Sequence, residues 1–294
     1  MLLAAVLQAA ALAALLALTP RLPGARWASR APAASLLLWQ ALGLAGGLLV
    51  LEVAATTALA PAGPDHLAAL RALPRPLPWW AWLAAALGAA VLGRLVWVLT
   101  RSTVGTVRLR RRHRRLVDLV ATRNPLLREM SVVDHALPIA YCLPGLRPRV
   151  VVSRGVLTAL EEDELRAVLD HELAHVVQRH DLVVLPFVAL RSTFPRLRAV
   201  CCAVDEVALL VEMLADDRAV RRHDPYALAR ALGKVSGGPA PAGGRGAGAS
   251  GVLLRAARLV DPPAPLGAPG RCAVLLAALG VLLLPVAGVL LPLA

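Results

Sequence analysis

The stretch Leu165-Arg-Ala-Val-Leu-Asp-His171-Glu172-Leu-Ala-His175-Val-Val177 decides how the polar part of this chain folds. Its apolar residues recur at helical spacing, and no proline or glycine interrupts residues 161–180, so it predicts a helix. Residues four apart lie one turn above each other on a helix, which places the imidazoles of His171 and His175 on one face. The stretch is therefore H-E-x-x-H on a helix, a pattern in which two histidines can share one metal ion.

The residue types of this pattern suit hydrolysis that depends on zinc (Zn2+). Zinc is held by neutral imidazole nitrogens and a carboxylate, and it lowers the pKa of a water in its open position to about 7. A neighbouring carboxylate then takes the proton and delivers it to the leaving amine. We expect His171 and His175 to be metal ligands and Glu172 to be the catalytic base. His223 and Arg218 are candidates for stabilising the oxyanion.

The same pattern also occurs as ordinary polar residues on solvated helices. Here the surroundings are apolar, and a buried polar group without a partner is costly, so they favour a bound metal. A third ligand is then needed. Asp181 stands at the position of the last ligand in H-E-x-x-H-x-x-G-x-x-H/D, but Gln178 replaces the glycine that allows the sharp turn. The stronger candidate is Glu212, on a second helical run at 204–222.

Asp216 lies one turn beyond Glu212 on that run, on the same helix face. A carboxylate there can hold the other ring nitrogen of a ligand histidine. Upstream, the segments 138–145 and 149–153 are rich in β-branched residues and are separated by a Pro-Gly break, which predicts two short strands joined by a turn. A strand edge beside the metal helix could bind an extended peptide by strand addition.

The composition of the whole chain is that of a membrane protein. Of its 294 residues, 58% are hydrophobic and 17% charged, against about 25% charged in soluble domains. Spanning a bilayer takes roughly 17–25 apolar residues. We predict three transmembrane helices within 1–100, a polar domain at 101–271 with a flexible Gly/Ala/Pro/Ser loop at 236–251, and a fourth transmembrane helix at 272–294. The first three helices are predicted at 2–18, 35–60 and 79–100.

The net charge of +13 comes almost entirely from arginine, because only one of the 32 basic residues is a lysine. Arginine-rich loops stay in the cytoplasm. Loop 20–33 carries +3 and loop 61–77 carries +1, while 101–115 holds seven arginines and no acid. We therefore predict a cytoplasmic domain with both termini outside. Residues 101–139 contain no aromatic side chain for base stacking, so the arginine run indicates contact with the lipid bilayer, and no direct nucleic-acid binding is expected.

Taken together, these motifs resemble the BlaR/MecR-type membrane metallopeptidases, especially their short actinobacterial members. The HtpX-like and CAAX-type membrane proteases are related, since they share H-E-x-x-H and Glu-x-x-Ala-Asp. Because the sequence stops at Ala294, we expect no extracellular penicillin-binding domain and no direct β-lactam sensing. The matching segments are Ala140-Tyr-Cys-Leu-Pro-Gly145, Val150-Val-Val-Ser-Arg-Gly155, Glu164–His175, Glu212-x-x-Ala-Asp216 and Arg255-Ala-Ala-Arg-Leu259.

The resemblance implies zinc bound by His171, His175 and Glu212, with Glu172 as the catalytic base. It also implies a BlaI/MecI-like winged-helix transcriptional repressor as the protein substrate. The alternatives are HtpX-like quality control of membrane proteins and a non-catalytic membrane scaffold. The expected fold is a multi-pass α-helical membrane protein with a cytoplasmic zincin-like α+β metallopeptidase domain.

Overall fold

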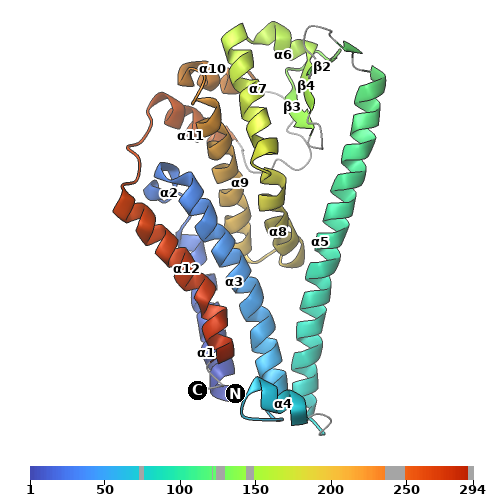
Figure 1. The fold of residues 1–294 in the computed structure, drawn as a ribbon, viewed down its shortest axis with the longest axis vertical. Coiled ribbons are helices and arrows are strands. Elements are labelled where there is room, and N and C mark those ends of the chain that lie inside the picture. The colour runs from blue at the N-terminus through green and yellow to red at the C-terminus, as the bar shows by residue number, and fades with distance from the viewer. Residues whose placement is uncertain (73–75, 121, 124–129, 144–148, 236–248, 291–294) are drawn as a thin grey trace.

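A computed structural model describes residues 1–72, 76–120, 122–123, 130–143, 149–235 and 249–290. Long helices form a bundle at one end of the molecule, and a smaller helical domain with a sheet lies at the other (Figure 1). The start of the first helix, at Leu2, and the end of the last helix, at Leu290, lie at the far end of the bundle, near α4 (His66–Ala72). The short helix α2 (Arg26–Arg30) lies toward the domain. The helices α2 and α4 therefore lie at opposite ends of the bundle.

Four helices in the described residues are long and apolar enough to cross a membrane. They are α1 (Leu2–Leu18), α3 (Pro32–Leu59), α5 (Trp79–Val120) and α12 (Ala268–Leu290). Each of the four predicted spans falls on one of these helices, with shifted bounds, and their crossing of a membrane stays a prediction. The third helix does not end near residue 100, because the residues that follow are mostly arginine, leucine and valine, without proline to stop it. The arginine run is therefore a helical continuation of the span.

The domain contains a four-stranded sheet in the order β1-β2-β4-β3. The predicted pair of strands is confirmed as β3 (Ala140–Leu143) and β4 (Arg149–Ser153), which are antiparallel with Tyr141 opposite Val151. The sequence analysis missed β1 (Thr122–Arg123) and β2 (Met130–Val133). β2 runs parallel to β4, so this pairing joins strands that are not neighbours in sequence. Within the described residues, β3 lies at one edge of the sheet.

Six helices complete the domain. α7 carries the H-E-x-x-H pattern, and α10 packs across its first half. A core at this end is formed by small and branched side chains that include Val156, Ala167, Val168, Leu228 and Ala231. The helices are α6 (Arg154–Ala159), α7 (Glu162–Val177), α8 (His180–Thr193), α9 (Arg198–Ala219), α10 (Pro225–Val235) and α11 (Ala249–Val260). Residues 249–251 of the predicted loop thus begin a helix, while 236–248 lie outside the described residues.

The hairpin of α8 and α9 packs directly on the membrane helices. The amide of Gln40 in α3 donates to the carbonyl of Val183 at 2.8 Å, and Arg94 in α5 donates to the carbonyl of Ser192 at 3.1 Å. The ring of Phe187 lies against Gly43, where a Cβ atom would be 3.3 Å from the ring. Gly43 is 11 residues into α3, or about 16 Å from the start of that helix. The hairpin therefore lies alongside the part of α3 that is nearer the domain (Figure 1).

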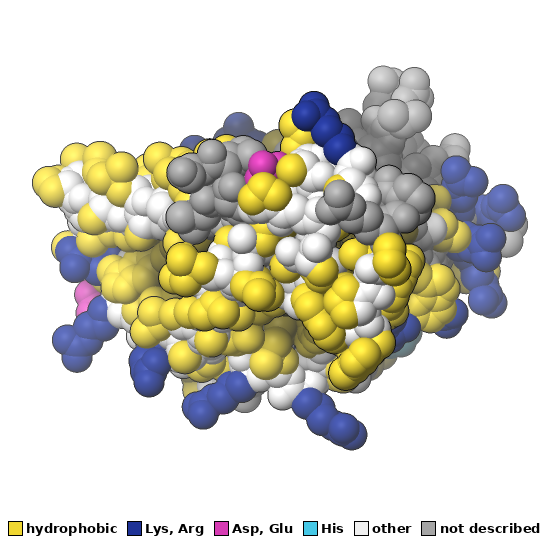
Figure 2. All heavy atoms as spheres, turned by 90° about the horizontal axis from the view of Figure 1, so that it is seen from below, with side chains coloured by type: hydrophobic (Ala, Val, Ile, Leu, Met, Phe, Trp, Pro, Cys, Tyr) yellow, Lys and Arg dark blue, Asp and Glu magenta, His cyan; other side chains and the backbone are white. Residues whose placement is uncertain are grey.

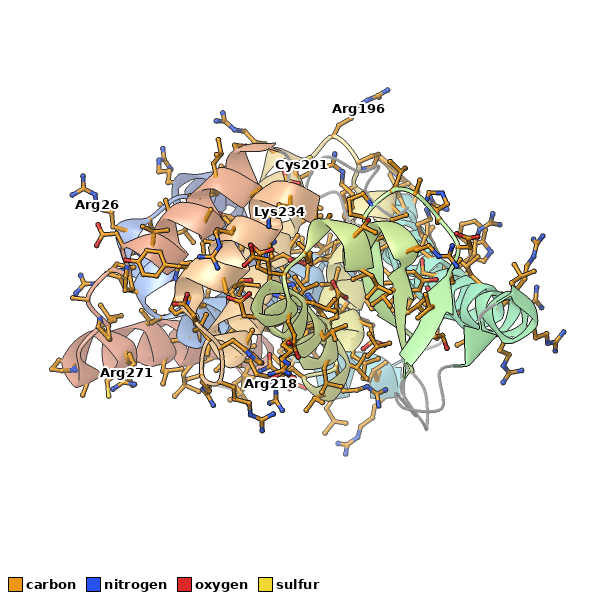
Figure 3. All side chains as sticks on the ribbon, turned by 90° about the horizontal axis from the view of Figure 1, so that it is seen from above. Arg26, Arg196, Cys201, Arg218, Lys234 and Arg271 are labelled. Carbon is orange, nitrogen blue, oxygen red and sulfur yellow. The ribbon has the colours of Figure 1, made fainter. Side chains whose placement is uncertain are left out.

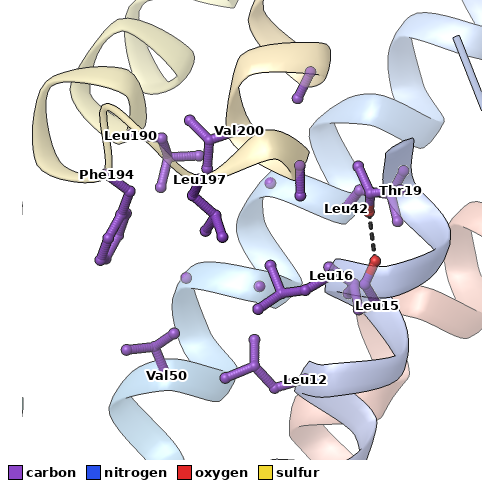
Figure 4. Close-up of a pocket in the computed structure, with 15 residues that line it drawn as sticks. Leu12, Leu15, Leu16, Thr19, Leu42, Val50, Leu190, Phe194, Leu197 and Val200 are labelled. Carbon is purple, nitrogen blue, oxygen red and sulfur yellow. Dashed lines mark hydrogen bonds between the residues drawn. The ribbon is translucent and has the colours of Figure 1, made fainter. Parts of the chain in front are cut away.

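A small apolar cavity of about 90 Å³ lies where the hairpin meets α1 and α3 (Figure 4). Its walls include Leu12 and Leu16 from α1, Val50 from α3, and Leu190 and Phe194 from the end of α8 and the residue after it. Thr19 also lines the cavity, and its hydroxyl donates to the carbonyl of Leu15 at 2.7 Å (Figure 4). Apolar packing thus joins the domain to the bundle.

The surface also has an apolar part and a charged part. Viewed from the α4 end, hydrophobic side chains cover most of the middle of the molecule, and Lys and Arg side chains project around the rim (Figure 2). From the opposite side, Arg26, Arg196 and Arg271 extend outward at the periphery (Figure 3). Among the described residues, the thiols of Cys201, Cys202 and Cys272 are free. This agrees with the absence of a Cys-x-x-Cys pair from the sequence.

Candidate metal centre

The helix α7 is fixed at both ends by local contacts. At its start, the side chain of Glu161 accepts from the N–H of Glu164, and the side chain of Glu164 accepts from the N–H of Glu161. Such a capping box satisfies backbone donors that a helix start leaves unpaired. At its end, Arg179 adopts a left-handed φ of 52°, and the chain bends by 65° into α8. The sharp turn after the H-E-x-x-H helix is therefore made by Arg179, although Gln178 replaces the glycine that would allow it.

The side chains of His171, His175 and Glu212 converge between α7 and α9. The Nε2 atoms of the two histidines are 3.2 Å apart. A carboxylate oxygen of Glu212 lies 3.4 Å from Nε2 of His171, and the other lies 3.6 Å from Nε2 of His175. Two ligand atoms about 2.0–2.1 Å from a tetrahedral zinc ion would be roughly 3.4 Å apart. The three side chains therefore fit one zinc ion.

Two further residues lie close to the outer nitrogens of these two histidines. Oδ1 of Asp216 lies 2.9 Å from Nδ1 of His171, and its carboxylate is 1% exposed. Nδ1 of His180, at the start of α8, lies 2.9 Å from Nδ1 of His175. Contacts to the nitrogen that faces away from a metal fix the tautomer and the orientation of the ring. The contact of Asp216 was predicted from the sequence; that of His180 was not.

Arg255 is the main member of this site that the sequence analysis left without a role. It comes from α11 and is 4% exposed. Its Nε and Nη2 donate to the two carboxylate oxygens of Asp216 at 2.8 and 2.7 Å, and its Nη1 lies 2.8 Å from Glu212. Arg255 occurs in the segment before the last span that resembled the family. Its contacts could not be foreseen, because they join residues about 40 positions apart.

Burial and neighbouring charges shift the pKa values of all three potential metal ligands. The hydrogen bonds and charge of His171, together with Arg255, outweigh burial and lower the pKa of Glu212 to about 2. Burial and the neighbouring His171 lower the pKa of His175 to about 4, which leaves its ring neutral. Burial opposes the charged form of His171, but its bonds to Asp216 and Glu212 prevail and raise its pKa to about 10. A histidine binds zinc in its neutral form, so metal binding at His171 would compete with a proton.

The remaining candidates lie outside this cluster. Among the described residues, only His171, His175 and Glu212 form a group able to hold a metal, so Asp181 is not part of it. Asp181 instead lies 3.8 Å from Arg179. Glu172 is half-buried on α7, and its charge contributes to the raised pKa of Arg255.

The two oxyanion candidates differ in their surroundings. Nε2 of His223 lies 2.9 Å from the carboxylate of Asp170, the residue before the first ligand histidine. This contact engages one of the two ring nitrogens of His223. Arg218 is half-buried near the end of α9. Neither residue joins the cluster of potential metal ligands.

Comparison with known proteins gives a consistent result for the part of the chain that carries the two histidines. Residues 106–210 match peptidase family M48. The matched region runs from the second half of α5 through the sheet, α7 and α8, and ends two residues before Glu212. Zinc suits the M48 family and this His/His/Glu donor set alike.

One curated relative is a "Protease HtpX homolog" from Methanothermobacter thermautotrophicus. It is 38% identical over 77 residues, which are 25% of this chain and 30% of the relative. The chain thus matches less than a third of the length of this relative. No solved structure matches the chain. The comparisons support a distant likeness to HtpX and an M48-type metallopeptidase region, while the BlaR/MecR resemblance stays a prediction.

Proposed function

We propose that this protein is a membrane-embedded zinc endopeptidase that cleaves a cytoplasmic protein. The convergence of His171, His175 and Glu212 carries the proposal. These three side chains would hold the metal, and a bound zinc ion would polarise the substrate carbonyl and lower the pKa of a water. The match to peptidase family M48 over the region with both histidines supports the same chemistry.

The proton transfers are assigned to Glu172. It follows His171 on α7 and is half-buried beside the cluster, so its carboxylate would accept the proton of the attacking water and donate it to the leaving amine. Asp216 and Arg255 have a different task, since both are almost fully buried. They keep His171 and Glu212 oriented, so that the donor atoms are already arranged when the metal binds.

The sheet suggests how a substrate would lie. β3 packs against α7 and has no neighbouring strand on its outer side within the described residues. An extended peptide added to this edge would pair with the backbone of residues 140–143. Such pairing is made by backbone hydrogen bonds and does not depend on the side chains of the substrate. A preference for particular substrate sequences would therefore come from the residues around the metal. The seven arginines at 101–115 support a cytoplasmic position of this edge.

The proposal has two candidate classes of substrate. The motif resemblance to BlaR/MecR-type peptidases favours a winged-helix repressor of the BlaI/MecI kind, cleaved during signalling. The likeness to a "Protease HtpX homolog" favours quality control of membrane proteins. Comparing the proteome of wild-type cells with that of cells carrying Glu172→Gln separates them. Accumulation of an intact repressor supports the first class, and accumulation of intact membrane proteins supports the second.

Zinc analysis tests the enzyme proposal itself against a non-catalytic membrane scaffold. We expect about one zinc ion per purified chain, lost in Glu212→Ala and kept in Glu172→Gln. Glu172→Gln should nevertheless abolish cleavage. A wild-type protein without stoichiometric zinc, or cleavage that persists in Glu172→Gln, contradicts the proposed mechanism.

A further inference from the structure

A second cavity, of about 400 Å³, lies between α2, α9 and α11. Its walls combine apolar side chains with a few charged ones. Its position is distinct from that of the metal cluster, although α9 and α11 also carry Glu212 and Arg255. The lining residues include Leu209, Leu210 and Met213 from α9, Leu254 and Ala257 from α11, and Ser29 from α2.

Glu206 supplies the buried charge of this cavity. It lies on α9 and is 8% exposed. Burial raises the pKa of its carboxyl, although the backbone N–H of Gly24 donates to it. Among the described residues, no basic side chain lies within ion-pair distance of Glu206, so a ligand could supply the positive partner of this carboxyl group. Asp261, at the end of α11, adds a second carboxylate to the wall.

The two arginines of the cavity wall do not neutralise Glu206. Both terminal nitrogens of Arg258 donate to the carboxylate of Asp217, at 2.6 and 3.1 Å. Its Nε donates to the carbonyl of Ser29 at 2.9 Å, so its hydrogen-bonding capacity is largely used. Arg26 is exposed and extends outward from the periphery (Figure 3). While Arg258 is paired and Arg26 is exposed, the carboxyl groups of Glu206 and Asp261 in the wall form no ion pair within the described residues.

The cavity lies at one end of the membrane helices. α2 joins the membrane helices α1 and α3, and Pro263, which lines the cavity, lies in the segment that leads into α12. Figure 1 shows α2 and the start of α12 at the end of the bundle nearest the domain. The cavity thus lies at the end of the apolar helices that is nearest the metal centre, where lipid headgroups are expected to lie if these helices span the bilayer.

We propose that this cavity binds a primary ammonium group, paired with Glu206 and Asp261, with an apolar stem against α9 and α11. A buried carboxylate is costly unless a charged donor pairs with it, and an ammonium group supplies three N–H donors. A quaternary ammonium group has no N–H to donate and is excluded as an equal substitute. The source is either the headgroup of phosphatidylethanolamine or a free amine.

Occupation of the cavity has a structural consequence. Leu254 in its wall precedes Arg255, and Arg258 joins α11 to Asp217 on α9. A ligand held between α2 and these helices stabilises the α9–α11 contact. Because this effect is measured by binding and stability, it can succeed or fail separately from the proposed peptidase activity.

Thermal unfolding of the full-length protein in lipid nanodiscs tests the proposal. The reference sample uses phosphatidylcholine alone. One arm adds phosphatidylethanolamine to the nanodisc, a second adds dissolved ethanolamine, and a third adds dissolved choline. We expect a saturable rise in Tm of about 2–4 °C with at least one of the two primary amines, and none with choline. A rise with phosphatidylethanolamine alone identifies a lipid ligand, and a rise with ethanolamine identifies a soluble one.

Variants assign the effect to the cavity. Glu206→Gln should abolish the rise, and Asp261→Asn should increase the amine concentration needed for half of it several-fold. Asp261 is exposed, so its variant serves even if Glu206→Gln folds poorly. Glu162→Gln changes an exposed acid on α7 and should leave the rise unchanged. The proposal is overturned if neither amine raises Tm, if choline is equally effective, or if both cavity variants respond like the wild type.

Discussion

Arg255 donates hydrogen bonds to both carboxylate oxygens of Asp216, from Nε at 2.8 Å and from Nη2 at 2.7 Å. The pair is almost completely buried, and Asp216 also contacts the outer nitrogen of His171. A bidentate bond of this kind fixes orientation as well as charge. We therefore expect the orientation of His171, a proposed zinc ligand on α7, to depend on an arginine from α11.

Replacing Arg255 with lysine tests this dependence. Lys keeps the positive charge but cannot form the planar bidentate bond, so we expect zinc affinity to fall about 10–100-fold. Competition with a zinc chelator measures the change. Arg166→Lys is the matched control, because Arg166 is exposed on α7 and pairs only with Glu162 among the described residues. Equal zinc affinity in Arg255→Lys and Arg166→Lys would rule out the positioning role.

His180 offers a second test of the outer contacts. If Nε2 of His175 binds the metal, its Nδ1–H donates to Nδ1 of His180, 2.9 Å away. His180→Ala leaves that buried donor unpaired, and we expect zinc affinity to fall at least tenfold. His180→Asn, which supplies an amide oxygen as acceptor, should recover part of the loss. The control is His135→Ala at an exposed loop histidine. A loss that Asn does not reduce would point to packing instead of hydrogen bonding.

The sequence predicted the parts of this molecule that depend on short-range patterns. H-E-x-x-H needs only one helical turn to bring His171 and His175 together, and apolar length alone predicted four long helices that the structure contains. Glu212 and Asp216 were found for a similar reason, because they lie one turn apart on an apolar helix. In each case, the spacing along one element already determines which face a side chain occupies.

The missed features depend on contacts between distant elements. One is the parallel pairing of β2 with β4, and another is the pair of hydrogen bonds from Arg255 to Asp216. Each joins segments that are far apart in the sequence, and no periodic pattern of residues predicts such a contact. The turn before α8 was judged from the absence of glycine, yet Arg179 adopts the left-handed conformation there. A left-handed backbone costs a non-glycine residue only about 1–2 kcal/mol, which surrounding packing can offset.

Glu164 predicts how stability depends on pH. Its carboxylate is fully buried, and Lys234 and Arg230 donate to it at 2.6 and 3.1 Å. Burial alone would raise its pKa, but the bonds to Lys234, the N–H of Glu161 and Arg230 outweigh burial and lower it. A lowered folded-state pKa stabilises the protein above the unfolded value near 4.5, and the gain is lost as pH falls through the folded value.

We therefore expect Glu164→Gln to reduce the free energy of unfolding by about 2 kcal/mol at pH 7. The difference from wild type should shrink as the pH falls below about 4.5. Denaturant unfolding in detergent at several pH values measures both. Glu162→Gln, at an exposed acid on the same turn, is the control and should change little. A difference that stays constant down to pH 3 would show that the charge of Glu164 does not contribute.

Phe187 tests whether the α8–α9 hairpin depends on its contact with the membrane helices. The ring is 1% exposed and lies against Gly43 of α3, so Phe187→Ala leaves a cavity at the joint between domain and bundle. Truncating a buried Phe costs about 3–5 kcal/mol. Leu182→Ala, at a side chain on α8 that is 52% exposed, should cost far less. Because α8 follows the turn after α7 and α9 carries Glu212, loosening this joint should also weaken zinc binding. Unfolding in detergent and chelator competition on both variants measure the two effects. Lower stability with unchanged zinc affinity would mean that the metal centre is held by α7, α9 and α11 alone, independently of the spans.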